Sequence, residues 1–280
     1  MTKVLKTKIT EQDGVFRYDY PEDVECVIVC GDIHGSFTEI AYKVTMQMDV
    51  HNALVIIAGD CGFGFNRLGF YDSLYQRKVA KLLKKNNVRF AFVRGNHDNP
   101  AYFSKRLIDH ERWRTVPDYS VICAASHDIL CVGGATSIDR KYRLSMKNNA
   151  ASGYDGDLSV RPAYYWWDEA PVFDENRLQT ALALGYDLID TVVTHTAPSF
   201  CDFVDKGPMV REYAENDMTL LADCDNEREQ MDKLYNALVS HKESLPLQNW
   251  IYGHFHASRR MSRDGILFTM LDCEELKQLY

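Results

Sequence analysis

The sequence predicts an α/β protein with a parallel-type core sheet, and three observations support this fold class. Short apolar runs alternate with helical stretches through the first third of the chain, a pattern typical of parallel strands joined by crossover helices. Each of these runs leads into a turn that carries Asp, Asn or His. The second half contains more strand-like runs and one long polar helix.

The first half supplies three strands and two helices. The strands are short, apolar and rich in β-branched residues, which favours buried strands: Cys26–Cys30, Ala53–Ala58 and Phe90–Val93. One helix is predicted from Ser36 to about Gln47, with Ser36 as its N-cap and Glu39 completing a capping box. A Lys-rich helix is predicted at Tyr71–Lys85. Before them, Gly14 indicates a turn in an edge strand or hairpin.

The second half adds a hairpin, three strands and a helix. The hairpin joins Val121–Ala125 to Ile129–Val132, and the helix covers about Met218–His241. The further strands are predicted at Leu188–Val193, Trp250–Tyr252 and Gly265–Leu271. Residues 139–168 are expected to be irregular and to form an active-site rim insertion, because such long loops are usually functional. With no repeat or low-complexity linker, the chain is expected to be one domain over residues 1–280.

Composition indicates a globular protein and limits its partners. Of the 280 residues, 46% are hydrophobic and 26% are charged, which is ordinary for a soluble domain. The net charge of −8 disfavours a protein that binds nucleic acid by bulk charge, without excluding nucleic acid. The negative net charge is compatible with a small phosphorylated substrate. The composition does not indicate an oligomeric state.

Cysteine usage and the N-terminus favour a cytoplasmic setting. Eight cysteines are present without any C-x-x-C pair, so a thiolate zinc knuckle is not predicted. The N-terminal residues lack the apolar core of a signal peptide, and no apolar run approaches membrane-spanning length. We therefore expect a reducing compartment and no membrane partner.

Five strand ends share one arrangement: an apolar run followed by a turn with metal-ligating side chains. Any one of them could be a capped turn or a surface histidine, but five in series predict a metal site. Five of the nine histidines fall at these positions. In chain order the residues are Asp32 and His34, Asp60, Asn96 and His97, His195, and His254 and His256.

The residue types indicate the kind of metal. Oxygen and nitrogen donors without thiolate suit Mn²⁺ first, with Fe, Zn²⁺, Co²⁺ or Ni²⁺ as alternatives to Mn²⁺. They suit Mg²⁺ or Ca²⁺, which prefer purely oxygen-lined sites, less well. These candidate ligands are too many for one ion, whereas a shared carboxylate can hold two ions ~3.5–4 Å apart. The sequence therefore predicts a site for two divalent ions.

These motifs resemble the calcineurin-like metallophosphoesterases, in particular small bacterial or phage-type members, over residues 26–256. The family's D-x-H is present as Asp32-Ile33-His34, its G-D as Gly59-Asp60 and its closing G-H-x-H as Gly253-His254-Phe255-His256. Its G-N-H-D is present as Gly95-Asn96-His97-Asp98, and a single histidine after a strand is His195. The resemblance implies a four-layer αββα sandwich of two sheets flanked by helices.

The resemblance also implies residue roles. One ion would be bound by Asp32, His34 and His256, and the other by Asn96, His195 and His254, with Asp60 bridging both. His97 would act on the leaving oxygen rather than bind metal, and Asp98 would hold its imidazole in the right tautomer. A metal-bridging hydroxide would attack phosphorus in line.

Some residues near the motifs have a less certain assignment. Arg94 precedes the third motif and is weighed equally as a phosphate-binding residue and as a structural salt bridge. Arg140 is a weaker candidate, for which pairing with Asp139 is the simpler interpretation. The aromatic cluster Tyr164–Trp167 is expected to pack or anchor the loop, with base stacking as the sharper alternative.

The predicted function is hydrolysis of a phosphomonoester or phosphodiester. The alternative from another class is a non-catalytic scaffold or binding module on the same fold, but a scaffold would be free to lose ligands. Within enzymes, a nucleotide phosphodiesterase or a nuclease remains open. A protein serine/threonine phosphatase is less favoured, because the second motif continues Gly59-Asp60-Cys61-Gly62 and lacks the arginine of that group.

Overall fold

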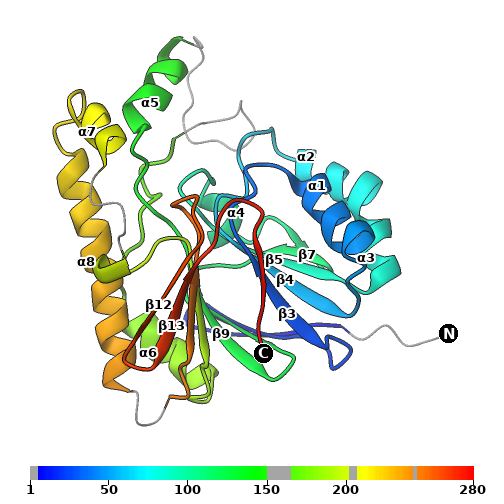
Figure 1. Ribbon diagram of the computed structural model, residues 1–280. Helices are drawn as coiled ribbons and strands as arrows, with labels where there is room; N and C mark the ends of the chain where they lie inside the picture. The colour runs from blue at the N-terminus through cyan, green and yellow to red at the C-terminus, as the bar shows by residue number, and fades with distance from the viewer. Residues whose placement is uncertain (1–5, 150–164, 202–206, 242–244) are drawn as a thin grey trace.

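The computed structural model describes residues 6–149, 165–201, 207–241 and 245–280, and it contains two β-sheets packed face to face. Figure 1 shows helices on both outer sides of this pair, so that the order of layers is helix, sheet, sheet, helix. The predicted fold class is confirmed: both sheets are mixed, and helices flank them.

The six-stranded sheet holds the three strands predicted in the first half. Its order is β14-β3-β4-β5-β7-β6, with β3 to β7 parallel and an antiparallel strand at each edge. The bounds are β3 Cys26–Cys30, β4 Ala53–Ala58, β5 Arg89–Val93, β7 Trp113–Thr115, β6 Asp109–His110 and β14 Leu276–Gln278. Every residue of β4 and β5 is buried, as expected for parallel strands covered on both faces.

The eight-stranded sheet combines the N-terminal hairpin with strands that follow residue 119. Its order is β1-β2-β8-β9-β10-β11-β13-β12, and β9, β10, β11 and β13 form its parallel centre. The bounds are β1 Lys8–Gln12, β2 Val15–Asp19, β8 Ser120–Ala124, β9 His127–Val132, β10 Thr191–Thr194, β11 Asn249–Tyr252, β12 Arg259–Arg263 and β13 Ile266–Met270. The predicted hairpin is β8–β9, and the strand predicted from Leu188 begins only at Thr191.

Helices cover the outer face of each sheet. Over the six-stranded sheet lie α1 Phe37–Tyr42, α2 Phe70–Leu74, α3 Ala80–Asn86 and α4 Ala101–Ser104, with π-helical segments η1 Lys43–Gln47 and η2 Tyr75–Val79 continuing α1 and α2. Over the eight-stranded sheet lie α6 Glu175–Leu184 and α8 Leu220–Ser240. The remaining short helices are α5 Arg140–Asn149, η3 Ser199–Cys201 and α7 Pro208–Ala214.

Two local predictions differ from the structure. The capping box at Ser36 is wrong, because the Ser36 side chain makes no cap hydrogen bond. The segment 139–168 is not irregular at its start, where residues 140–149 form α5. Residues 150–164, which include Tyr164 of the aromatic cluster, lie outside the described residues.

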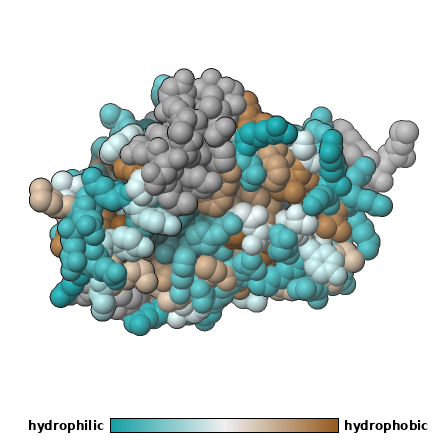
Figure 2. Space-filling model, turned by 90° about the horizontal axis from the view of Figure 1, so that it is seen from above, coloured by the Kyte–Doolittle hydropathy of each residue, from teal (hydrophilic) through white to brown (hydrophobic). Residues whose placement is uncertain are grey.

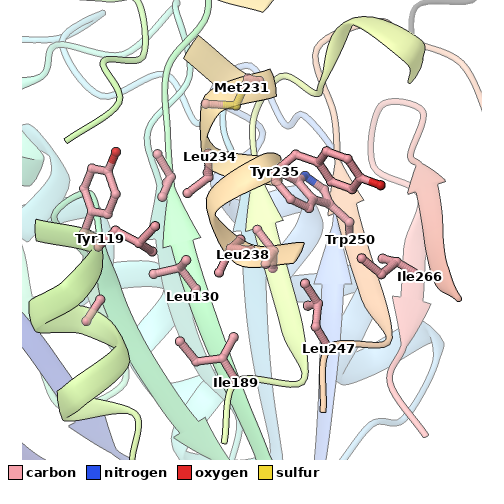
Figure 3. Packing of buried hydrophobic residues seen from close by; sticks show 14 of the residues in the cluster. Tyr119, Leu130, Ile189, Met231, Leu234, Tyr235, Leu238, Leu247, Trp250 and Ile266 are labelled. Carbon is pink, nitrogen blue, oxygen red and sulfur yellow. The ribbon is translucent and has the colours of Figure 1, made fainter. Parts of the chain in front are cut away.

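Three apolar clusters hold the layers together. Alternate residues of β3 point to opposite faces: Val27 and Val29 belong to the cluster between the sheets, whereas Ile28 and Cys30 face the helices. On the far side, α8 places Met231, Leu234, Tyr235 and Leu238 on one helical face over the eight-stranded sheet, beside Trp250 and Leu130 (Figure 3). The core therefore fixes how the two sheets lie against each other.

Two whole-chain features complete the description. All eight cysteines lie in the described parts of the chain, and each is a free thiol. Among the described helices, none combines the length and apolarity that crossing a membrane requires.

Candidate metal centre

The predicted ligands lie at the carboxyl ends of five strands, and the two sheets share them. The six-stranded sheet carries Asp32 and His34 after β3, Asp60 after β4, and Asn96 and His97 after β5. The eight-stranded sheet carries His195 after β10 and both His254 and His256 after β11. Figure 2 looks down on this side of the molecule, where hydrophilic side chains lie next to a hydrophobic patch.

Backbone hydrogen bonds join these loops to one another. The carbonyl of Asp60 accepts the amide of His34 at 2.8 Å, which links the loops after β3 and β4. Across the sheets, the amide of His254 donates to Oδ1 of Asp32 at 3.0 Å. Within the eight-stranded sheet, the amide of Gly253 donates to the carbonyl of His195 at 3.1 Å. The ligands are thus carried by loops that are tied together independently of any ion.

Two glycines permit these loops to approach closely. A Cβ on Gly59 would lie 2.1 Å from Nδ1 of His195, and φ at Gly59 is +98°. A Cβ on Gly253 would lie 2.1 Å from Oδ1 of Asp32. Any side chain at either position would push a predicted ligand out of place.

The first donor group consists of Asp32, His34 and His256. Nε2 of His34 lies 3.0 Å from Nε2 of His256, which in turn lies 3.1 Å from Oδ2 of Asp32. Together with Asp60, these residues offer ligand atoms that all lie within 4.8 Å of one another. The Asp32 side chain is fully buried, whereas His34 and His256 are exposed.

The second donor group consists of Asn96, His195 and His254. Nε2 of His195 lies 3.0 Å from Oδ1 of Asn96, and the ring centroids of His195 and His254 are 5.0 Å apart. Nδ1 of His195 lies 2.8 Å from the carbonyl of Ala58 and donates to it, so Nε2 is the ring nitrogen that would bind a metal in exchange for its proton. The Asn96 amide donates to Oγ of Ser137 at 3.0 Å, so its oxygen is turned toward His195.

Asp60 lies between the two groups. Its Oδ1 is 3.2 Å from Nε2 of His195, and it also belongs to the cluster with His34 and His256. Burial opposes ionisation of Asp60, but the positive charge on neighbouring imidazoles, led by His195, holds its pKa well below the usual range. Burial also disfavours the charged form of His195 and by itself would lower its pKa. The Asp60 and Asp32 carboxylates outweigh this effect and raise the pKa of His195 to about 10.

The donor set fits divalent ions. Two ligand atoms that bind one ion at 2.0–2.1 Å, with a right angle at the ion, are about 3.0 Å apart. The closest pairs of donor atoms in both groups are 3.0–3.2 Å apart. Asp32 and Asp60 are buried carboxylates that face chiefly imidazoles, and buried charge of this kind is stabilised by a cation. Oxygen and nitrogen donors together suit Mn²⁺ and its neighbours in the first transition series.

His97 lies at the edge of the centre. Its Nε2 is 3.9 Å from Oδ2 of Asp60, and its ring packs edge-on to His34 with centroids 5.4 Å apart. The side chain is 27% exposed, so a substrate can reach it.

The predicted role of Asp98 is wrong. Instead of orienting His97, its carboxylate accepts four backbone amides, from Cys61, Gly62, Phe63 and Gly95, at 2.7–3.0 Å. Burial and the charge of Asp60 raise the pKa of Asp98 to about 6, against the opposing effect of these amides. Asp98 therefore braces the loops that carry Asp60 and Asn96.

Both arginines named as substrate residues have structural partners. Arg94 is buried, donates to Asp118 at 2.9 Å and donates to the carbonyl of Glu169 at 2.6 Å. Arg140 binds Asp217 and Asp223 rather than Asp139. The structure therefore does not support a phosphate-binding role for either guanidinium.

Three residues near the centre escaped the motif analysis. Ser137 follows β9, and its hydroxyl accepts a hydrogen bond from the side-chain amide of Asn96. The carboxylate of Glu169 in turn accepts hydrogen bonds from the backbone amide and the hydroxyl of Ser137, both at 2.7 Å. Cys273 lies with His34 and His256 in a second group of potential ligand atoms within 4.8 Å. The strand end before Gly133-Gly134 could have indicated Ser137, but no local pattern marks Glu169 or Cys273.

The described part of the aromatic cluster mostly packs. Trp166 is buried against Gly64, and Tyr165 is buried with Arg143 over its ring. Trp167 is 80% exposed. Packing, the simpler prediction, accounts for Trp166 and Tyr165.

The chain matches a known protein family. The family model described as calcineurin-like phosphoesterase matches residues 27–258. A comparison with curated protein sequences yields no match.

Solved structures that match the chain do so at low sequence identity. Phosphopantetheinyl hydrolase from Mycobacterium tuberculosis is 13% identical, covering 91% of this chain and 96% of its own, with a TM-score of 0.38. TT1561 of Thermus thermophilus is 12% identical over 91% and 98% of the chains, with a TM-score of 0.49. GAP50 of Plasmodium is 13% identical over 88% and 71%, with a TM-score of 0.37. Values this low carry no argument about function.

Proposed function

The chain belongs to the calcineurin-like phosphoesterase family, which makes it a metal-dependent hydrolase of phosphoric esters, and we propose that its centre holds two divalent ions together. The observation that carries this proposal is the place of Asp60 between two donor groups. One group offers Asp32 with two histidines, and the other offers Asn96 with two histidines. A single carboxylate in contact with both groups is the usual link in a two-metal site.

The residues of the centre would have different roles according to their positions. Divalent ions in such a site lower the pKa of bound water and stabilise negative charge on a phosphoryl group. Asp32, His34 and His256 would hold one ion, Asn96, His195 and His254 the other, and Asp60 both. The buried carbonyl of Ala58 accepts a hydrogen bond from Nδ1 of His195, so that Nε2 is the nitrogen that would bind the ion. His97 is proposed to donate a proton to the leaving oxygen.

We propose a small phosphomonoester or phosphodiester as substrate and Mn²⁺ as the metal. The donor types support Mn²⁺ without distinguishing it from Fe, Zn²⁺, Co²⁺ or Ni²⁺. The negative net charge supports a small substrate over nucleic acid. Nucleotide phosphodiesterase activity falls within this proposal as its diester form.

The test is hydrolysis of p-nitrophenyl phosphate and its bis ester by metal-free enzyme reloaded with Mn²⁺. Bound metal is counted by inductively coupled plasma mass spectrometry in the same samples. Turnover of the first ester alone indicates a monoesterase, and turnover of the bis ester indicates a diesterase. Turnover of neither, with two ions bound, would favour the scaffold alternative and contradict the proposal.

Asp60→Asn tests the bridging role. The variant is expected to lose affinity for both ions together, because the neutral amide removes the charge that both groups share. Asp49→Asn is the control, since Asp49 is an exposed aspartate whose side chain contacts His51. Selective loss of one ion from Asp60→Asn would contradict bridging.

A further inference from the structure

Cys273 lies beside the first donor group although it belongs to none of the family motifs. It follows β13 and is exposed. Its Sγ, one ring nitrogen of His34 and one ring nitrogen of His256 all lie within 4.8 Å of one another. A thiol and two imidazoles in one cluster form a His₂Cys donor set, which differs from the oxygen and nitrogen set of the motifs.

Backbone contacts fix the turn that carries Cys273 against the centre. The amide of Glu274 donates to the carbonyl of Asp32 at 2.9 Å, and the amide of Gly31 donates to the carbonyl of Glu275 at 3.0 Å. Nζ of Lys43 donates to the carbonyl of Glu274 at 2.7 Å. The loop of the ligand Asp32 and the turn of Cys273 therefore form one hydrogen-bonded unit.

The two imidazoles already converge. Their Nε2 atoms face each other at 3.0 Å, a spacing suited to two ligands of one ion. A zinc ion with Zn–N bonds near 2.0–2.1 Å and a Zn–S bond near 2.3 Å places sulfur about 3.5 Å from each nitrogen in a tetrahedral site. The ligand atoms of the observed cluster lie within 4.8 Å of one another. Because these side chains are exposed, a small movement brings them to the spacing of a zinc site.

We propose that Cys273 is a thiolate ligand of the ion held by His34 and His256. The thiol proton would pass to water as the sulfur binds the ion. A thiolate favours soft and borderline ions such as Zn²⁺ and Co²⁺ over Mn²⁺. The first donor group would therefore bind Zn²⁺ or Co²⁺ more tightly than Mn²⁺ when these ions compete, and would bind Mn²⁺ when it is supplied alone. The second donor group, built from Asn96 and histidines, would keep the proposed preference for Mn²⁺. This inference rests on the proposed metal centre.

Cobalt spectroscopy tests the ligand directly. Metal-free protein is loaded with Co²⁺, and thiolate-to-cobalt charge transfer is recorded in the near ultraviolet while bound cobalt is counted. The wild type and Cys224→Ser are expected to show the band, and Cys273→Ser is expected to lack it with the same cobalt content. Cys224 is a matched control because it is another partly accessible free cysteine, on α8.

Metal affinities give a second readout without activity. Cys273→Ser is expected to weaken Zn²⁺ binding about 10–100-fold and to leave Mn²⁺ binding unchanged. Equal loss of Zn²⁺ and Mn²⁺ affinity, or none of either, would overturn the proposal.

Thiol protection uses the unmodified chain and does not depend on a variant folding. N-ethylmaleimide labelling of each cysteine is followed by peptide mass spectrometry with and without Zn²⁺. Zn²⁺ is expected to slow labelling of Cys273 and to leave Cys224 unaffected; equal labelling of Cys273 in both conditions would overturn the inference. A wild type that binds two cobalt ions without the band overturns this inference alone, whereas a wild type that binds no ion overturns the proposed function as well.

Discussion

Left-handed backbone dihedrals recur at four predicted ligands, none of which is glycine. The φ values are 42° at His34, 46° at Asp60, 69° at His254 and 47° at His256. Residues with a side chain seldom adopt this region, and each such residue costs about 1–3 kcal/mol. The loop hydrogen bonds described above hold the chain in these conformations, which aim the side chains at a common point.

Gly59→Ala tests the close approach of β4 to His195. The new methyl would meet the imidazole, so we expect loss of bound metal and a lower free energy of unfolding. Gly69→Ala is the matched control, because Gly69 has φ of +83° and open space at its Cβ position. Gly69→Ala should lower the free energy of unfolding only by the backbone strain, about 1–2 kcal/mol. This variant should keep its bound metal. Urea unfolding and metal analysis measure both effects, and equal effects would contradict the collision.

His97→Ala tests the proposed proton donor. The variant should keep both ions and lose about 10²–10⁴-fold in rate on an alkyl phosphate, with a smaller loss on p-nitrophenyl phosphate, whose leaving group needs no proton. His51→Ala is the control, since His51 lies on the surface beside Asp49. Loss of a metal ion from His97→Ala would show that His97 is a ligand.

Single residues also show where sequence reasoning stopped. The motif residues could be located because they follow recognisable strands, and the structure gathers all seven predicted ligands at one side. Arg94 was left open between phosphate binding and a salt bridge, because adjacency to a motif does not tell where a long side chain ends, and the structure shows that it reaches Asp118 and the carbonyl of Glu169. Asp98 was misjudged for the opposite reason: its short side chain meets four nearby amides.

At the scale of elements, Glu169 connects the loop after β9 to α5. Its carboxylate binds Ser137 and lies 3.5 Å from Arg143 of α5. Burial raises its pKa from 4.5 to about 8, although Arg143 and Ser137 favour the ionised form. The folded protein therefore binds a proton there that the unfolded chain releases between pH 4.5 and 8.

The pH dependence of unfolding tests this connection. A carboxyl whose folded pKa exceeds its unfolded pKa loses stability as pH rises through that window, at up to about 1.4 kcal/mol per pH unit. The stability of metal-free wild type relative to Glu169→Gln should therefore fall from pH 5 to pH 8. Glu175→Gln, at the exposed start of α6, should show a constant difference. Parallel curves for wild type and Glu169→Gln would contradict the raised pKa.

Elements were predictable where hydrophobic pattern and length agreed. The strands β3 and β4 match their predicted bounds, because each is a short apolar run closed by glycine. Short elements such as β6, with two residues, and α4, with four, carry too little pattern to be recognised. The π-helical segments η1 and η2 continue helices that were predicted as regular, since their sequences keep a helical spacing.

At the scale of the whole molecule, each donor group draws on both sheets. Asp32 and His34 come from the six-stranded sheet and meet His256 of the other, while Asn96 meets His195, whose ring lies beside that of His254. The apolar cluster between the sheets therefore sets the distance between the two parts of each group. This arrangement supports one domain over residues 1–280, which stays a prediction.

Neighbouring residues of β4 test this dependence. Ile56 faces the other sheet and Ile57 faces the helices, and both are fully buried. Ile56→Ala and Ile57→Ala should each lose about 2–5 kcal/mol of unfolding free energy. Mn²⁺ affinity should fall further in Ile56→Ala, because only that cavity lies between the sheets. Equal Mn²⁺ affinity in the two variants would contradict the dependence.

The most direct measurement of the central claim is the number of Mn²⁺ ions bound per chain, together with the electron paramagnetic resonance spectrum of the loaded protein. The proposed centre predicts two ions whose spins are coupled through Asp60, and their joint loss in Asp60→Asn. One ion per chain in fully active enzyme, or two ions with the spectra of isolated Mn²⁺, would contradict it.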